Sequence, residues 1–260
     1  MRDAIVPGIK DSALRDRIIR YESLLAREES AFRVAISSQA PYLQRAASSQ
    51  VREDMIWLYE QRLNESAPGK VIRGEILGLA NGKCPLCDVG LVKTLEHSFP
   101  KSAYPRLAVD PMNLVPCCRD CNFNRGVGSG NGGMNPYVDD WATANQWLSA
   151  SVVSQAQPYL LRFQPMWNPN ISPAQHLRLQ LHFDDYGLDE RYQLQAIDEF
   201  MLLQASLVRI SPTLSKEMIF EVLKERLFNC VSVRGSNHWQ TAAYAAWVVE
   251  ANSINWVTAV

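Results

Sequence analysis

The chain has 260 residues, of which 47% are hydrophobic and 20% are charged, so it can form one large or two modest folded cores. Its formal net charge of −1 disfavours a protein that coats nucleic acid through bulk attraction. It contains no run of about 18 apolar residues, the length that a membrane span needs, and its first residues lack the apolar segment of a signal peptide. We therefore expect a cytoplasmic protein with no membrane partner.

The charge is divided unequally between the two halves of the chain. Residues 1–126 carry 18 Lys and Arg against 15 Asp and Glu, whereas residues 127–260 carry 8 against 12. Because opposite charges attract over long distances, a polyanionic partner is expected to bind the N-terminal half.

We predict that residues 1–80 form an N-terminal helical region. Apolar residues recur at three- and four-residue steps from residue 11 to residue 38, and a second amphipathic stretch covers 42–63. The pair Pro68-Gly69 separates the second stretch from a short helical segment over 71–79.

Residues 81–150 predict a less regular module. Prolines interrupt the stretch 84–125, which is too irregular to fold without an added crosslink. A glycine-rich run over 126–133 indicates a flexible connector, and residues 136–150 read as a helix.

Residues 151–260 predict a mainly helical C-terminal region with a short β element. The run from Leu177 to Phe183 alternates apolar and polar residues, which is the period of a half-buried strand, and residues 159–163 are its candidate partner. Three further helices are expected over 189–208, 213–228 and 237–250. The predicted fold class is therefore α+β, with most of the chain helical.

Four cysteines form two matched pairs, Cys84/Cys87 and Cys118/Cys121, each with the spacing Cys-x-x-Cys. In a reducing compartment such pairs are more often metal ligands than disulfides. Four thiolates define a closed, structural zinc site with no open position for water. We therefore predict a structural Zn²⁺ that joins the two ends of the irregular module.

The segments around these pairs carry a family pattern. They read Leu95-Glu96-His97-Ser98-Phe99-Pro100-Lys101-Ser102, then Asn113-Leu114, then Cys121-Asn122-Phe123-Asn124-Arg125-Gly126. The pattern resembles the zinc-containing HNH endonucleases, also called the ββα-metal family. The resemblance covers residues 84–126 and implies an HNH module embedded in a mainly helical protein.

The resemblance implies roles that agree with the chemistry of the side chains. An imidazole has an ordinary pKa of about 6.5, so His97 suits a general base near neutral pH. Glu96 and Asn122 offer oxygen ligands suited to a catalytic Mg²⁺ or Mn²⁺. The resemblance gives Asn113 the task of tying the strand and the loop together around His97.

The same resemblance leaves Lys101 and Arg125 as candidate phosphate contacts. Each residue also has a plainer interpretation. Glu96-His97 can be a surface pair, Asn122 a helix N-cap and Asn113 a turn residue. Lys101 and Arg125 can be solvated charges.

The resulting hypothesis is a metal-dependent endonuclease that hydrolyses nucleic-acid phosphodiester bonds, with DNA as the expected substrate. The helical segments on either side of the module resemble those of small bacterial HNH proteins of anti-phage defence, which implies a partner such as a defence-system ATPase. The alternative is a zinc-containing module that binds nucleic acid or protein without cutting. A nuclease requires Glu96 and His97, whereas a binding module does not.

Overall fold

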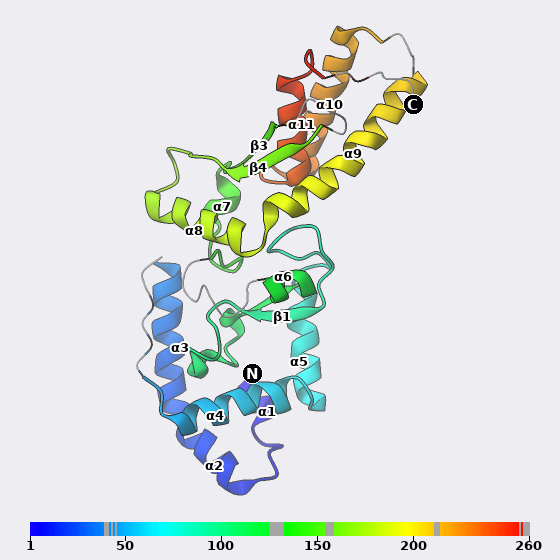
Figure 1. The fold of residues 1–260 in the computed structure, drawn as a ribbon. Helices are drawn as coiled ribbons and strands as arrows, with labels where there is room; N and C mark the ends of the chain where they lie inside the picture. Colours follow the sequence, from blue (N-terminus) through cyan, green and yellow to red (C-terminus); the bar gives the residue numbers. More distant parts are fainter. Residues whose placement is uncertain are drawn as a thin grey trace. The chain divides into compact units, whose positions relative to one another are not determined.

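The computed structural model describes residues 1–38, 42, 44, 46–124, 133–153, 159–210, 214–254 and 256. It divides into two compact units, which we call unit 1 (Met1–Asp139) and unit 2 (Asp140–Val260) (Figure 1). The described part is mainly helical with two small antiparallel sheets, which confirms the predicted class. None of its helices combines the length and hydropathy needed to cross a bilayer.

Unit 1 begins with helices and ends with a small sheet. Its helical elements are α1 (Arg2–Ile5), α2 (Ser12–Arg20), α3 (Glu22–Ser37), α4 (Ser49–Trp57), the π-helix η1 (Leu58–Leu63) and α5 (Ala67–Gly78). The following elements are β1 (Thr94–His97), the 3-10 turns η2 (Pro105–Leu107) and η3 (Pro111–Asn113), β2 (Leu114–Cys117) and α6 (Arg119–Asn124). The helices predicted over the first 80 residues are present, with shifted ends.

Side-chain caps explain where these helices start. Asp11, Ser48 and Ser66 each accept a hydrogen bond from a backbone N–H in the first turn of α2, α4 and α5. The single helix predicted over 11–38 divides at Tyr21, whose N–H bonds to the carbonyls of both Arg17 and Ile18. Such a tightened turn ends α2 before α3 begins.

The core of unit 1 joins its helices to the sheet. Leu95 of β1 and Leu114 of β2 pack into the cluster formed by α1, α2, α4, η1 and α5. A second, aromatic cluster centres on Phe32 and Tyr42, with Phe99 packed against both rings at centroid distances of 5.2 Å and 5.7 Å. The loop that follows β1 is therefore anchored to α3 by aromatic contact.

The strands β1 and β2 pair with each other and are followed by α6. The two strands are antiparallel, with Glu96 opposite Val115 and His97 opposite Leu114. Helix α6 follows β2 and packs against β1. Two short strands are marginal in isolation, so the hairpin depends on the helices around it.

Unit 2 corrects two predictions. Its elements are α7 (Trp141–Ala144), β3 (Leu148–Val152), β4 (Leu161–Pro165), α8 (Pro173–Asp185), α9 (Leu188–Ile210), α10 (Lys216–Arg234) and α11 (Trp239–Val249). The strand predicted from Leu177 to Phe183 is wrong, because these residues lie in α8. The helix predicted over 136–150 is wrong over most of its length, because its last residues form β3, which pairs with β4. Helices α9, α10 and α11 confirm the other three predictions, with shifted ends.

One correction has a local cause and the other a distant one. Ser172 and Gln175 form a reciprocal capping box with Pro173 in the first turn, which starts a helix at α8. The buried positions of α8 are Leu179, His182 and Phe183, at steps of three and four residues, so the period is helical. The strand β3 begins where Asn237 Oδ1 accepts the N–H groups of Trp147 and Leu148 at 2.7 Å and 3.1 Å, a contact that crosses 90 residues.

Candidate functional site

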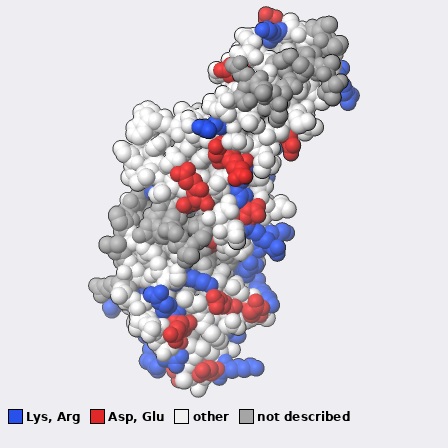
Figure 2. Space-filling model, viewed as in Figure 1, with Lys and Arg blue, Asp and Glu red and all other residues white. Residues whose placement is uncertain are grey.

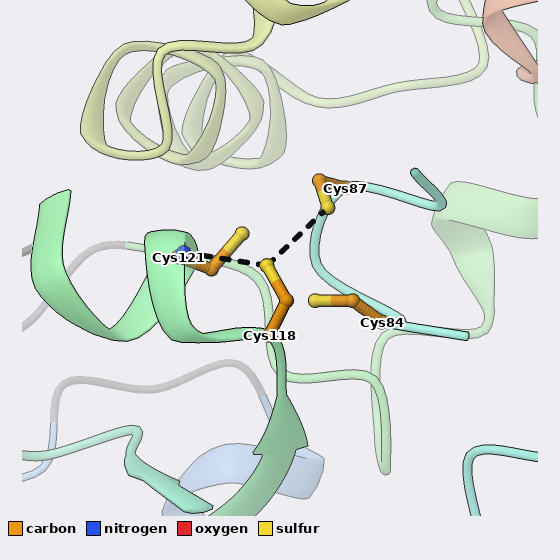
Figure 3. Close-up of side chains that lie close together, drawn as sticks. All are labelled: Cys84, Cys87, Cys118 and Cys121. Carbon is orange, nitrogen blue, oxygen red and sulfur yellow. Dashed lines mark hydrogen bonds between the residues drawn. The ribbon is translucent and has the colours of Figure 1, made fainter. Parts of the chain in front are cut away.

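Four cysteines converge in unit 1 (Figure 3). The Sγ atoms of Cys84, Cys87, Cys118 and Cys121 all lie within 4.8 Å of one another, and all four residues are buried. Cys84 and Cys87 belong to the loop between α5 and β1, Cys118 follows β2 and Cys121 lies in α6. The fold thus joins the two pairs across the irregular module, as the sequence predicts.

The spacing of the sulfurs suits one tetrahedral metal ion. A zinc–thiolate bond of about 2.3 Å gives a sulfur–sulfur edge of about 3.8 Å, and Cys87 Sγ lies 3.9 Å from Cys118 Sγ. A disulfide would hold two sulfurs about 2.05 Å apart, and these cysteines are free thiols. Four buried cysteines in this arrangement can bind a zinc ion.

Gly90 allows the backbone to approach this cluster closely. Its N–H donates to Cys87 Sγ at 3.4 Å, which stabilises a thiolate. A Cβ atom at position 90 would lie 2.6 Å from the Cβ and 2.7 Å from the Sγ of Cys118, closer than atoms can pack. Position 90 therefore requires glycine. The sequence analysis missed this residue, whose signal was its place three residues after the first Cys-x-x-Cys pair.

Asn113 ties the loop after β1 to the start of β2. Its side chain is fully buried. Its Oδ1 accepts the Phe99 N–H at 2.6 Å, and its Nδ2 donates to the carbonyl oxygens of Phe99 at 3.0 Å and Leu107 at 3.1 Å. Its backbone carbonyl accepts the Ser98 N–H at 2.8 Å. These bonds hold the chain directly after His97, which is more than a surface turn residue would do.

His97 lies on the buried face of β1 and is 8% exposed. Its Nε2 lies 2.9 Å from the Ala108 carbonyl oxygen. A carbonyl oxygen only accepts, so Nε2 donates in this bond. The surface-pair interpretation of His97 is therefore wrong, and the bond to Ala108 orients the imidazole.

Tyr59 of η1 packs against His97. The two rings meet edge to face, with centroids 4.5 Å apart and planes at 63°. Burial raises the pKa of Tyr59 above its usual value, so the phenol is neutral around pH 7. The sequence does not predict this contact, because Tyr59 lies outside the module, in the predicted N-terminal helical region. Tyr59 belongs to the π-helix η1, and such helical irregularities are often found at functional sites.

The other two predicted cation ligands lie on elements that touch. Glu96 is half-buried, on the face of β1 opposite to His97, and Asn122 is exposed on α6, which packs against β1. The N-cap interpretation of Asn122 does not hold, since it lies inside α6 and its N–H bonds to the Cys118 carbonyl.

The two predicted phosphate contacts have different outcomes. Lys101 Nζ lies 2.7 Å from Glu60 Oε1 and 4.7 Å from the centroid of the Tyr59 ring. A phosphate would have to replace that carboxylate, so Lys101 supports the Tyr59 ring in this structure. Arg125 lies outside the described residues.

Parts of the chain are similar to known proteins. It is 30% identical to protein Ea31 of Escherichia phage lambda over 178 residues, which is 64% of this chain and 60% of Ea31. It is 35% identical to the Septu protein PtuB of Bacillus thuringiensis over 75 residues, which is 26% of this chain and 29% of PtuB. The chain thus spans only part of the length of either relative. No family model matches it, and no solved structure does so.

Proposed function

We propose that this protein is a metal-dependent endonuclease of the HNH type that hydrolyses phosphodiester bonds in DNA. The observation that carries the proposal is the fixed imidazole of His97. Its Nε2 lies 2.9 Å from the Ala108 carbonyl oxygen, a contact that orients the ring, and Nδ1 is the nitrogen that would act as the general base. The strand that carries this base is crosslinked on one side by the cysteine cluster and on the other by Asn113.

Each side chain has a defined task in this proposal. His97 Nδ1 takes a proton from the attacking water, and Asn113 and Tyr59 keep the imidazole in place. Glu96 and Asn122 would hold a Mg²⁺ or Mn²⁺ ion, which neutralises the charge that develops on the phosphate. The zinc ion would serve the structure of the module alone, because four thiolates complete its coordination.

A plasmid-nicking assay with Mg²⁺ or Mn²⁺ tests the proposal. The wild type should cut, and His97→Ala should lower the rate by about 10²–10⁴-fold, the usual contribution of a general base. His176→Ala, in unit 2, is the matched control and should cut like the wild type. Zinc content and circular dichroism should be the same in all three proteins, so that loss of cutting is not loss of fold.

The alternative function, a binding module that does not cut, is favoured by the burial of His97, since buried imidazoles bonded to carbonyls also occur as purely structural groups. It predicts no metal-dependent cutting by the wild type. Equal cutting by wild type and His97→Ala would likewise remove His97 from the reaction.

We further propose a role in bacterial anti-phage defence beside a partner such as a defence-system ATPase. The similarity to the Septu protein PtuB supports this role. The net charge of −1 supports a dependence on a partner, because the chain lacks the bulk attraction that would bring it to DNA unaided. The same two variants, compared with wild type in a phage plating assay, test the defence role: only His97→Ala should lose protection.

A further inference from the structure

A cavity of about 510 Å³ opens beside β1 in unit 1. Helix α5 contributes Lys70, Arg73, Gly74 and Leu77, which lie on one face of the helix at steps of three and four residues. Tyr59 of η1, Thr94 of β1, and Asn64 and Glu65, which precede α5, complete the lining. None of the α5 residues belongs to the family pattern, and no role has been given to them above.

The cavity borders the candidate catalytic residues. The Tyr59 ring that lines it is the ring that packs against His97 at 4.5 Å. Thr94 lies two residues before Glu96 and on the same face of the strand. Besides the dominant effect of burial, the charges of Arg73 and Glu96 act in opposite directions on the pKa of Tyr59, so all three share one neighbourhood.

The cations in this lining can exchange their present partners for a phosphate. Lys70 pairs with Glu65 at 3.6 Å, but both side chains are more than half exposed, and such surface pairs contribute little free energy. Arg73 Nη2 donates to the Lys93 carbonyl at 3.3 Å, which uses one of five guanidinium donors. Figure 2 shows Lys and Arg side chains gathered on the edge of unit 1 where Figure 1 places α5.

We propose that Lys70 and Arg73 form a binding site for the phosphate backbone of duplex DNA, alongside the strand that carries Glu96 and His97. This inference rests on the proposed function for the identity of the ligand. Residues three apart on a helix are about 5–6 Å apart at Cβ, so the two cations reach neighbouring phosphates. The site has no groove-reading element, and it binds DNA without regard to base sequence.

Gly74 provides the sharpest variant, because it lies between the two cations and Leu77 on the cavity face. A Cβ atom at this position would meet nothing within 4 Å, so the backbone has room for a side chain here and Gly74→Glu adds a negative charge to the cavity lining. The change also raises helix propensity, which favours folding. Val71→Glu is the matched control, since Val71 is 63% exposed on the same helix and does not line the cavity.

The experiment measures fluorescence anisotropy of a labelled duplex against protein concentration at several salt concentrations. The buffer contains no Mg²⁺ or Mn²⁺, so that the DNA stays uncut. It also contains no chelator, so that the cysteine cluster keeps its ion. Gly74→Glu should weaken binding at least about tenfold relative to Val71→Glu, which corresponds to about 1.4 kcal/mol. The double variant Lys70→Ala/Arg73→Ala should reduce the slope of log K against log salt by about 2, since each phosphate contact contributes about 0.9.

Equal binding by Gly74→Glu and Val71→Glu, an unchanged salt slope, or no binding by the wild type at low salt would overturn the inference. Nicking by the wild type is measured separately. If the wild type cuts while the cavity variants bind normally, the cavity inference fails alone. If the wild type does not cut but the cavity variants lose binding, the cavity binds DNA and the nuclease proposal fails.

Discussion

The module of unit 1 and the core of unit 2 reach an ordered structure in different ways. Between α5 and α6 the chain has only two four-residue strands and short 3-10 turns, and it is held by packing against the helices of unit 1, by the bonds of Asn113 and by the convergence of the four cysteines. Unit 2 surrounds a hairpin with long helices and buries aromatic rings, among them Phe200, Trp247 and Trp256.

The comparison indicates why the module would gain stability from a metal ion. Long amphipathic helices bury enough apolar surface to fold around a core on their own. Short strands and turns are marginal alone, so neighbouring helices, hydrogen bonds and the crosslink that four cysteines can form would hold them together. Irregular backbone is also what places a polar side chain such as His97 against a carbonyl oxygen, so the feature that makes the module hard to fold is the one that positions the candidate site.

Removal of the metal ion should have the largest effect on the difference between the module and unit 2. Cys118→Ser, or treatment of the full chain with a strong chelator, should raise hydrogen exchange across residues 84–124, because binding of a structural zinc ion contributes about 10–16 kcal/mol to folding in small modules. Exchange in unit 2 should not change. Hydrogen exchange by mass spectrometry, with zinc content measured alongside, is the readout.

Cys230→Ser is the matched control, since Cys230 is a free cysteine outside the cluster. It should keep both zinc and exchange protection. Protection of residues 84–124 that survives loss of the metal would show that packing alone orders the module.

The converse experiment removes a ring from unit 2. Trp247 is fully buried and contacts Phe200, Tyr244 and Trp256. Trp247→Ala should lower the free energy of unfolding of unit 2 by about 3–5 kcal/mol and leave the zinc content of unit 1 unchanged. Thermal or urea unfolding followed by circular dichroism measures the loss.

Trp167→Ala, at a side chain that is 57% exposed, should unfold like the wild type. A loss of zinc in Trp247→Ala would contradict the expectation that the two regions are stabilised independently of each other.

A smaller effect is expected from Asp110, which caps η3 beside the module. Its Oδ1 accepts the Met112 N–H, its Oδ2 has no partner, and burial raises its pKa to about 6. The folded state therefore holds this proton more tightly than the unfolded state. The resulting stability is fully present below about pH 4 and is lost as the pH rises through about 6.

Asp110→Asn should accordingly stabilise the protein at pH 7.5 by about 1–3 kcal/mol, and the gain should vanish below pH 4. Urea unfolding across this pH range is the measurement. Asp54→Asn is the control, because the pKa of Asp54 is shifted in the opposite direction. Burial alone would raise the pKa of Asp54. Hydrogen bonds from Arg17, Gln50 and Tyr21 outweigh burial and hold that pKa below its usual range. A pH-independent effect of Asp110→Asn would show that the pKa of Asp110 is the same in the folded and unfolded states.

The sequence predicted those features that depend on spacing along the chain. The two Cys-x-x-Cys pairs indicated one metal site, and the structure brings their sulfurs within 4.8 Å. The sequence also predicted the helical periods of α2, α3 and α9, because each of these helices buries one stripe of its own residues. The roles of Glu96, His97 and Asn122 in catalysis stay predictions.

The errors in unit 2 arose where local and distant signals compete. Alternating Leu177, Leu179 and Leu181 indicated a strand, yet the cap at Ser172 and the burial of Leu179 and Phe183 decided for a helix. The end of the predicted helix near residue 150 became β3, because its hydrogen-bond partners are β4 and Asn237. No local pattern reveals a partner that is 90 residues away.

By itself, the sequence determined which residues can bind zinc and which segments have the periodicity of helices, because both follow from side-chain chemistry at short spacing. Only the tertiary structure decided that His97 Nε2 meets the Ala108 carbonyl, that Tyr59 lies against that ring, and that the cations of α5 border the same strand. The physical reason is that these contacts join segments far apart along the chain, and burial in a common core, not sequence spacing, brings them together.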